Sequence, residues 1–141
     1  MSSKKKSLVL VSGCLAGINC RYDGGNNANE EVVELVKQGK AIPVCPEQLG
    51  GMQTPREPAE IRVGRVMEKG GEDVTDKFKK GAMEALRLCK MCGCKKAILK
   101  DGSPSCGVNR IYDGTFGGVK IAGKGVFARL LEENGVEVEG K

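Results

Sequence analysis

Thiols carry most of the reactive chemistry that this sequence offers. Seven cysteines stand among 141 residues, and the chain has no histidine. The absence of histidine removes the Cys–His nucleophile pair, the mixed Cys and His zinc site and the usual proton shuttle of neutral pH. Any acid–base step therefore falls to Asp, Glu, Lys, Tyr or water, and metal binding or thiol chemistry is the leading explanation for the cysteines.

Three of the cysteines lie in short turns that contain glycine. Cys14 stands in SGCLAG, Cys45 in VCPEQLGG and Cys106 in SPSCGVN. A single free cysteine is commonly a small buried hydrophobe. Three cysteines that each follow an apolar run and enter such a turn favour a shared site instead. Three thiolates in one site need compensating positive charge, and a metal would supply it.

The type of ligand indicates the type of metal. Three thiolates without a nitrogen ligand suit a soft, multi-iron centre better than a catalytic zinc ion. A [4Fe–4S] cluster normally takes four cysteines. If only three are available, one iron keeps the open position that metal-ion catalysis requires. A zinc ion held by three thiolates and a water is the alternative.

Polar side chains next to these cysteines are the candidates for acid–base work. Glu47 lies two residues after Cys45, and Ser103 and Ser105 come just before Cys106. A carboxylate held beside a cluster and away from water has a raised pKa and moves protons at neutral pH. The alternatives are an exposed, solvated carboxylate for Glu47 and a turn that bonds its own backbone for the serines.

The elements that position these residues follow from the spacing of apolar side chains. Short apolar runs predict buried strands, the last of them a possible one, at 8–11, 41–44, 97–99 and 136–138. Helical spacing predicts helices that begin after Asn29, at Asp73 and at Val126 and that end near Gly39, Gly93 and Gly135. Pro43 indicates the start of its strand or an edge position. Residues 46–70 fit an irregular loop with a small extended or hairpin excursion.

Strands that alternate with helices predict right-handed crossovers, a mostly parallel sheet and a three-layer, Rossmann-like α/β fold. We expect residues 1–141 to form a single domain, with residues 1–6 flexible. In such sheets ligands bind beyond the carboxyl ends of the strands. Cys14, Cys45 and Cys106 each follow a predicted strand. The sequence therefore places these three thiols at one edge of the sheet.

A second group of cysteines, Cys89, Cys92 and Cys94, has the CxxC spacing of many metal sites. It lies at the end of a predicted helix and before a predicted strand, which places it at the opposite edge of the sheet. Two interpretations stay open: Cys89 packs in the core and the other two are turn thiols, or the group is a second metal site or redox pair. Cys20 is either a spare ligand near Cys14 or a loop residue.

The charge and aromatic content disfavour nucleic acid as a partner. The formal net charge is +5, from 23 Lys+Arg against 18 Asp+Glu, and the charges are spread along the sequence. Two Tyr, three Phe and no Trp leave little material for base-stacking platforms. Arg21, Arg56 and Lys100 either neutralise an anionic cluster or orient a polar substrate, or they are ordinary surface charges.

The first residues, MSSKKKSLVLVSG, contain an apolar run that is too short for a signal-peptide core or a membrane span. An odd number of cysteines without export features also argues against a disulfide framework. We therefore expect a cytoplasmic protein with reduced thiols and no membrane partner.

Four stretches of sequence, spread over residues 9–138, carry a resemblance to a known family: VSGCLAGINCRYDGG, VCPEQLGGMQTPREPAEI, LKDGSPSCGVNRIYDGTFGG and GKGVFARLLEENGVEV. With these motifs the chain resembles the thiouracil desulfurases, formerly a family of unknown function. The resemblance implies a [4Fe–4S] cluster held by three cysteines, which match Cys14, Cys45 and Cys106. It also implies that the acid–base glutamate falls on Glu47 and the helper serine on Ser103, with Ser105 as the second choice.

The activity that the resemblance implies is non-redox desulfuration of a small thiolated pyrimidine such as 2-thiouracil, giving uracil and sulfide. The open iron would polarise the C=S bond as a Lewis acid, and Glu47 would activate the attacking water. Ser103 would orient water or substrate, or relay a proton. The rival interpretation is a non-catalytic zinc or redox-thiol module, in which Cys92 and Cys94 carry the thiol chemistry.

Overall fold

The computed structural model describes residues 7–141, so the expected flexibility of residues 1–6 lies outside the described residues. The strands in chain order are β1 (Val9–Ser12), β2 (Ala41–Val44), β3 (Ala59–Arg62), β4 (Arg65–Glu68), β5 (Lys96–Leu99), β6 (Arg110–Tyr112), β7 (Lys120–Ala122) and β8 (Glu137–Gly140). The helices are the 3₁₀ turn η1 (Gly13–Ala16), α1 (Glu30–Lys37), α2 (Pro46–Leu49), α3 (Thr75–Met91) and α4 (Val126–Glu133). None of these helices is both long enough and apolar enough to cross a membrane.

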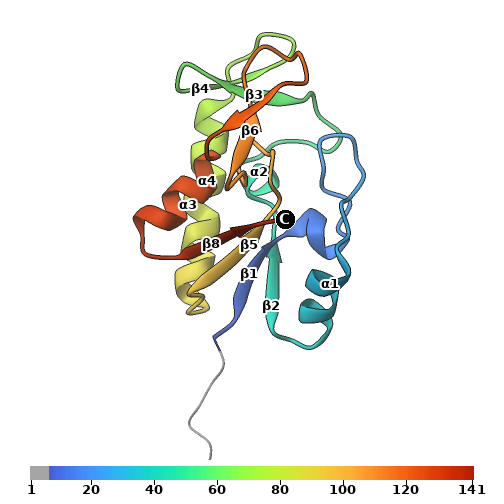
Figure 1. Cartoon of the computed structure of the whole chain (residues 1–141), viewed down its shortest axis with the longest axis vertical. Coiled ribbons are helices and arrows are strands. Elements are labelled where there is room, and N and C mark those ends of the chain that lie inside the picture. Colours follow the sequence, from blue (N-terminus) through green and yellow to red (C-terminus); the bar gives the residue numbers. More distant parts are fainter. Residues whose placement is uncertain (1–6) are drawn as a thin grey trace, which may run out of the picture.

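A four-stranded parallel sheet organises the molecule (Figure 1). The strand order is β2-β1-β5-β8, so β2 and β8 are the edge strands. The prediction of an α/β fold with a mostly parallel sheet is confirmed, and the possible fourth strand is present as β8. Pro43 lies in the edge strand β2, where the missing backbone N–H leaves no gap inside the sheet.

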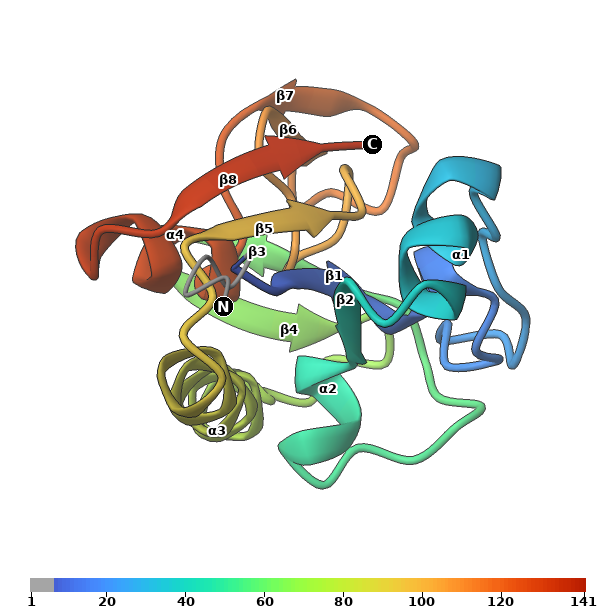
Figure 2. The same ribbon diagram turned by 90° about the horizontal axis from the view of Figure 1, so that it is seen from below.

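Helices cover both faces of this sheet (Figure 2). Leu10 and Leu99 point to one face, where they pack with side chains of α3 and α4. Val11 and Ile98 point to the other face and pack against α1, whose Val32 is fully buried. This alternation is the two-residue period of a strand, and it explains why the strands read as continuous apolar runs: both faces are covered.

Local capping sets where the predicted helices begin. The side chain of Asn29 accepts a hydrogen bond from the Val32 amide at 3.2 Å, so it caps α1 as predicted. The helix predicted to begin at Asp73 begins at Thr75. The Asp73 carboxylate accepts hydrogen bonds from the Thr75 amide at 2.9 Å and the Thr75 hydroxyl at 2.6 Å. Asp73 therefore belongs to the turn that starts α3 rather than to the helix itself.

Two antiparallel hairpins, β3–β4 and β6–β7, lie beyond the carboxyl ends of the sheet strands (Figure 1). The first is the hairpin excursion that the sequence predicts within residues 46–70. The second lies in a glycine-rich stretch, and its strand β7 is exposed at every position, so no apolar alternation marks it. The short helix α2 was likewise not predicted, because four residues are too few to show a helical period.

Helix α2 is seated directly on α3 by two glycines. A Cβ atom at Gly50 would overlap the Lys77 carbonyl oxygen of α3, and one at Gly81 would overlap the Pro46 carbonyl oxygen of α2. Only residues without a side chain permit so close an approach of two helix backbones. Glu47 lies in the first turn of α2. The long, core-packed helix α3 thereby fixes the position of this carboxylate.

Candidate functional site

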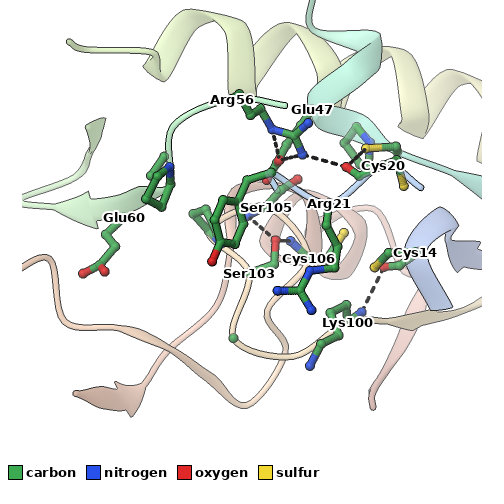
Figure 3. A pocket seen from close by; sticks show the side chains of 18 of the residues that line it. Cys14, Cys20, Arg21, Glu47, Arg56, Glu60, Lys100, Ser103, Ser105 and Cys106 are labelled. Atoms are coloured by element: carbon green, nitrogen blue, oxygen red, sulfur yellow. Dashed lines mark hydrogen bonds and ion pairs between the residues drawn. The ribbon is translucent and has the colours of Figure 1, made fainter. Parts of the chain in front are cut away.

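A cavity of about 470 Å³ lies at the carboxyl edge of the parallel sheet. Its volume falls within the range of about 300–1,000 Å³ that is usual for small-molecule sites. All three cysteines of the predicted shared site line it: Cys14, Cys45 and Cys106. So do the predicted polar residues Glu47, Ser103 and Ser105 (Figure 3).

Each of the three cysteines reaches the cavity from the end of a different parallel strand. Cys14 lies in η1 directly after β1, and Cys45 is the residue between β2 and α2. Cys106 lies in the loop that follows β5. Parallel strands all end at the same edge of a sheet, so residues far apart in the chain meet there. Among residues 7–141 no three Cys, Asp or Glu side chains converge tightly enough to hold a single metal ion. The thiols surround the cavity and do not meet at one point.

The three thiols affect one another electrostatically. Burial raises the pKa of the Cys106 thiol, and the nearby Cys14 and Cys45 thiols raise it further, although a hydrogen bond with the Ser12 hydroxyl opposes the rise. Burial likewise raises the pKa of Cys14, and the Cys45 thiol adds to this effect. An ionised Cys45 thus makes it harder for Cys14 and Cys106 to ionise. Positive charge placed between the thiols would offset this effect.

Cys20 is a fourth thiol on the same cavity wall, and its side chain is buried. The Cys45 thiol donates a hydrogen bond to the Cys20 carbonyl oxygen at 3.8 Å, and the adjacent Cys20 side chain lowers the pKa of Cys45 to about 7. The same contact raises the pKa of Cys20, so Cys20 keeps its proton while Cys45 ionises. The structure thus places Cys20 beside Cys45 in the cavity wall, with its carbonyl oxygen accepting from the Cys45 thiol, and the role of Cys20 as a spare ligand stays a prediction.

Glu47 is paired with Arg56 in the wall of the cavity (Figure 3). The Arg56 Nε donates to Glu47 Oε2 at 2.9 Å, and Nη2 donates to the same oxygen. Nη2 also donates to the carbonyl oxygen of Cys20 at 2.8 Å. The side chains of Arg56 and Glu47 are only 6% and 14% exposed. Arg56 is therefore not a surface charge, and Glu47 is not a solvated loop carboxylate.

The environment of Glu47 contains two opposed effects. Burial raises the pKa of the Glu47 carboxyl, and the Arg56 guanidinium acts against that rise. The raised pKa shows that burial is the stronger effect. Sequence reasoning named Arg56 but had no way to pair it with Glu47. The two residues are nine positions apart, across the end of α2 and the loop that follows it, and no periodicity relates their positions.

The two serines before Cys106 have different environments. The Ser103 hydroxyl oxygen accepts hydrogen bonds from the Ser105 amide at 3.0 Å and the Cys106 amide at 2.9 Å. This is the backbone-bonded turn that was the alternative interpretation of the serines. The Ser105 hydroxyl is buried on the cavity wall and has no hydrogen-bond partner within residues 7–141. A buried hydroxyl without a partner costs free energy, so a bound group that completes it is stabilised there.

The second group of cysteines lies away from this cavity. Cys89 and Cys94 are buried in the core beneath α3 and α4, and Cys92 packs against the same core. The Cys89 thiol donates to the carbonyl oxygen of Cys94 at 3.6 Å. The group follows the end of α3 and precedes β5, so it lies at the amino edge of the sheet, as predicted. None of these three cysteines lines the cavity that contains Glu47.

Both a family match and a solved structure relate this chain to thiouracil desulfurases. The family described as 2-thiouracil desulfurase matches residues 9–140. A Bacillus subtilis (strain 168) protein, named uncharacterized protein YbbK, is 46% identical, and the match covers 93% of each of the two chains. A solved structure titled [4Fe-4S]-dependent thiouracil desulfidase TudS is 43% identical and has a TM-score of 0.92, covering 96% of this chain and 91% of that one.

The Glu47–Arg56 pair yields a stability prediction. A double-mutant cycle of Glu47→Gln and Arg56→Gln, measured by urea unfolding of the reduced apoprotein, should give a coupling energy of at least about 1.5 kcal/mol, because removing one partner leaves a buried charge. The exposed pair Glu84–Arg87 is the matched control and should give about 0.5 kcal/mol or less. Equal coupling energies for the two pairs would show that the cavity pair is solvated.

Proposed function

The chain belongs to the 2-thiouracil desulfurase family, and we propose that its cavity carries out the desulfuration of a thiolated pyrimidine such as 2-thiouracil. The protein is an enzyme of the thiouracil desulfidase type and depends on a [4Fe–4S] cluster. The observation that carries the proposal is the presence of three cysteine thiols and a buried carboxylate in the wall of one cavity. We propose a small molecule, not a nucleic acid, as the substrate. We place the enzyme in the cytoplasm, where its free thiols stay reduced.

The donor set of the cavity fits such a cluster. Cys14, Cys45 and Cys106 offer three soft thiol ligands from three separate segments. The raised pKa values of Cys14 and Cys106 favour a bound group that brings positive charge to these thiols, and iron supplies it. We assign these three as the cluster ligands. In the rival interpretation Cys92 and Cys94 carry the thiol chemistry. These two cysteines lie at the amino edge of the sheet, so none of the acid–base groups of the cavity is near them.

When bound through three cysteines, a [4Fe–4S] cluster supplies an iron with an open position, and soft iron binds soft sulfur. The overall reaction exchanges the C=S group of the substrate and one water for a C=O group and hydrogen sulfide. No electrons are gained or lost. The chain must therefore hold the pyrimidine, take a proton from the attacking water and return a proton to the departing sulfur.

We assign the proton transfers to Glu47. Both hydrogen bonds from Arg56 go to Oε2, so Oε1 is the oxygen left to accept a proton from water. Burial raises the pKa of this carboxyl, which brings it closer to neutral pH and makes it a better base and acid in turn. Arg56 acts as a positioning residue, because it holds the carboxylate against the Cys20 backbone.

The serines divide the remaining work. Ser105 is a residue of the cavity wall, and its buried hydroxyl has no partner within the described residues, so we assign it to donate to the substrate or to the water. Ser103 holds the turn that carries Ser105 and Cys106. This supports Ser105 as the helper serine and Ser103 as its positioning residue, the reverse of the order that the resemblance implied.

The cluster assignment is tested by iron content. Anaerobically reconstituted protein should hold about four irons per chain, the content of one [4Fe–4S] cluster. Cys14→Ala, Cys45→Ala and Cys106→Ala should each lower bound iron by at least about half and abolish sulfide release from 2-thiouracil, because two thiols do not retain the cluster. Cys92→Ala, at the other edge of the sheet, should keep both. Three variants that still hold four irons and still turn over would refute the assignment.

The role of Glu47 is tested separately from cluster binding. Glu47→Gln should keep the iron content and visible spectrum of the reconstituted protein but lower kcat about 10²- to 10⁴-fold, the usual contribution of a positioned acid–base group. Glu57→Gln is the matched control, because Glu57 lines the same cavity but is exposed. A Glu47→Gln variant with wild-type kcat would assign the proton transfers to another group.

A further inference from the structure

The aromatic residues of this chain are few, and they are concentrated at one place. The chain has two Tyr, three Phe and no Trp. Four of these five residues line the cavity: Tyr22, Phe78, Tyr112 and Phe116. The fifth, Phe127, lies in the main core. Aromatic rings are the usual platform on which a protein stacks a nucleobase. The small number of aromatic residues disfavours a platform for a nucleic-acid strand, but the cavity has enough aromatic rings to stack one base.

Phe116 is the ring among these four that remains available. Phe78 is buried in a core cluster at 2% exposure. Lys120 Nζ lies 5.4 Å from the centre of the Tyr112 ring, and Arg21 lies 5.7 Å from the centre of the Tyr22 ring. No cation covers Phe116 in the described part of the chain, and its side chain is half-buried at the cavity wall.

The backbone of Phe116 is held in an unfavourable conformation. Its φ of +58° is in the left-handed region, which bulky residues rarely adopt. Such conformations persist only where surrounding contacts impose them, and they gather at ligand sites. Here a glycine would be the easier residue, and glycines stand on either side at Gly114 and Gly117. The presence of a phenylalanine indicates that its ring has a use.

Glu60 of β3 imposes this conformation. Its buried carboxylate oxygen Oε1 accepts hydrogen bonds from the Gly114 amide at 3.0 Å and the Phe116 amide at 3.1 Å. Gly114 itself, at φ +91°, lies so close to β3 that a Cβ atom would sit 2.7 Å from the Ile61 carbonyl oxygen. Glu60 lies well apart from the cysteines Cys14 and Cys20 in Figure 3. It therefore acts on the loop and not on the cluster ligands.

We propose that Phe116, presented by the Glu60 carboxylate, is the surface on which the pyrimidine ring of the substrate stacks, and that it determines the affinity for planar thiolated bases. The inference rests on the proposed function, because it names how that site holds its substrate. Phe116 is a substrate-binding residue, and Glu60 is its positioning residue. A flat aromatic ring accepts either pyrimidine isomer, so 2-thiouracil and 4-thiouracil should both depend on it.

The test uses the reconstituted holoenzyme, with steady-state kinetics on 2-thiouracil and calorimetric binding of the product uracil. Phe116→Leu, which keeps an apolar side chain but removes the ring, should raise KM and the uracil Kd about 5- to 100-fold and leave kcat and iron content within about twofold. Phe116→Tyr should restore both constants. Val119→Ala, in the same loop but outside the cavity wall, is the matched control and should change neither.

Two further variants separate the ring from the backbone. Phe116→Gly removes the backbone strain and should stabilise the loop, yet it should raise KM as much as Phe116→Leu. Glu60→Gln keeps an acceptor oxygen and should retain slow amide hydrogen exchange at Gly114 and Phe116 with a near-normal KM. Glu60→Leu removes the acceptor oxygen, so it should speed amide hydrogen exchange at Gly114 and Phe116 and raise KM.

Unchanged KM and uracil Kd in Phe116→Leu and Phe116→Gly, with an active wild type, would overturn the stacking proposal and leave the proposed function standing. A wild type that releases no sulfide would overturn the proposed function, and weaker 2-thiouracil binding by Phe116→Leu would still support the stacking. If the wild type binds neither 2-thiouracil nor uracil, both proposals are rejected.

Discussion

The negative charge that thiols of one cavity would accumulate is the constraint on which the site depends. Cys14, Cys45 and Cys106 surround the cavity, Cys45 raises the pKa of Cys14, and both raise the pKa of Cys106. Water cannot screen these charges well, because burial already disfavours ionisation. In the proposed assignment, a [4Fe–4S] cluster would offset this charge by placing iron between the thiols, while the Glu47–Arg56 pair adds a carboxylate whose own charge is already balanced.

The parallel sheet makes this arrangement possible. Crossover connections return every strand in the same direction, so the chain delivers three cysteines to one edge without any local motif. The positions of the remaining groups depend on contacts outside the sheet. Gly50 and Gly81 seat α2 and its carboxylate against α3, and Glu60 fixes the loop that carries Phe116. Helix α3 and strand β3 thus fix the positions of Glu47 and Phe116, which lie on a short helix and on a loop.

The sequence predicted those elements that are marked by an apolar run, by helical spacing of apolar residues, or by a capping or turn residue at their ends. Short apolar runs predicted the four sheet strands, and the turns after three of those strands placed the three cysteines. Sequence reasoning failed where a side chain of a helix or strand contacts an irregular loop. The Arg56 pairing with Glu47 and the Glu60 bonds to Gly114 and Phe116 leave no trace in spacing. The β6–β7 hairpin was missed because exposed strands carry no apolar signal.

Iron-edge anomalous diffraction from anaerobically grown crystals of the reconstituted protein would locate the cluster. We expect anomalous peaks in the cavity within bonding distance of the Cys14, Cys45 and Cys106 sulfurs, about 2.3 Å as for other metal–thiolate bonds, with one iron lacking a protein ligand. Iron bound instead at Cys89, Cys92 and Cys94, or Cys20 in place of one of the three, would contradict it.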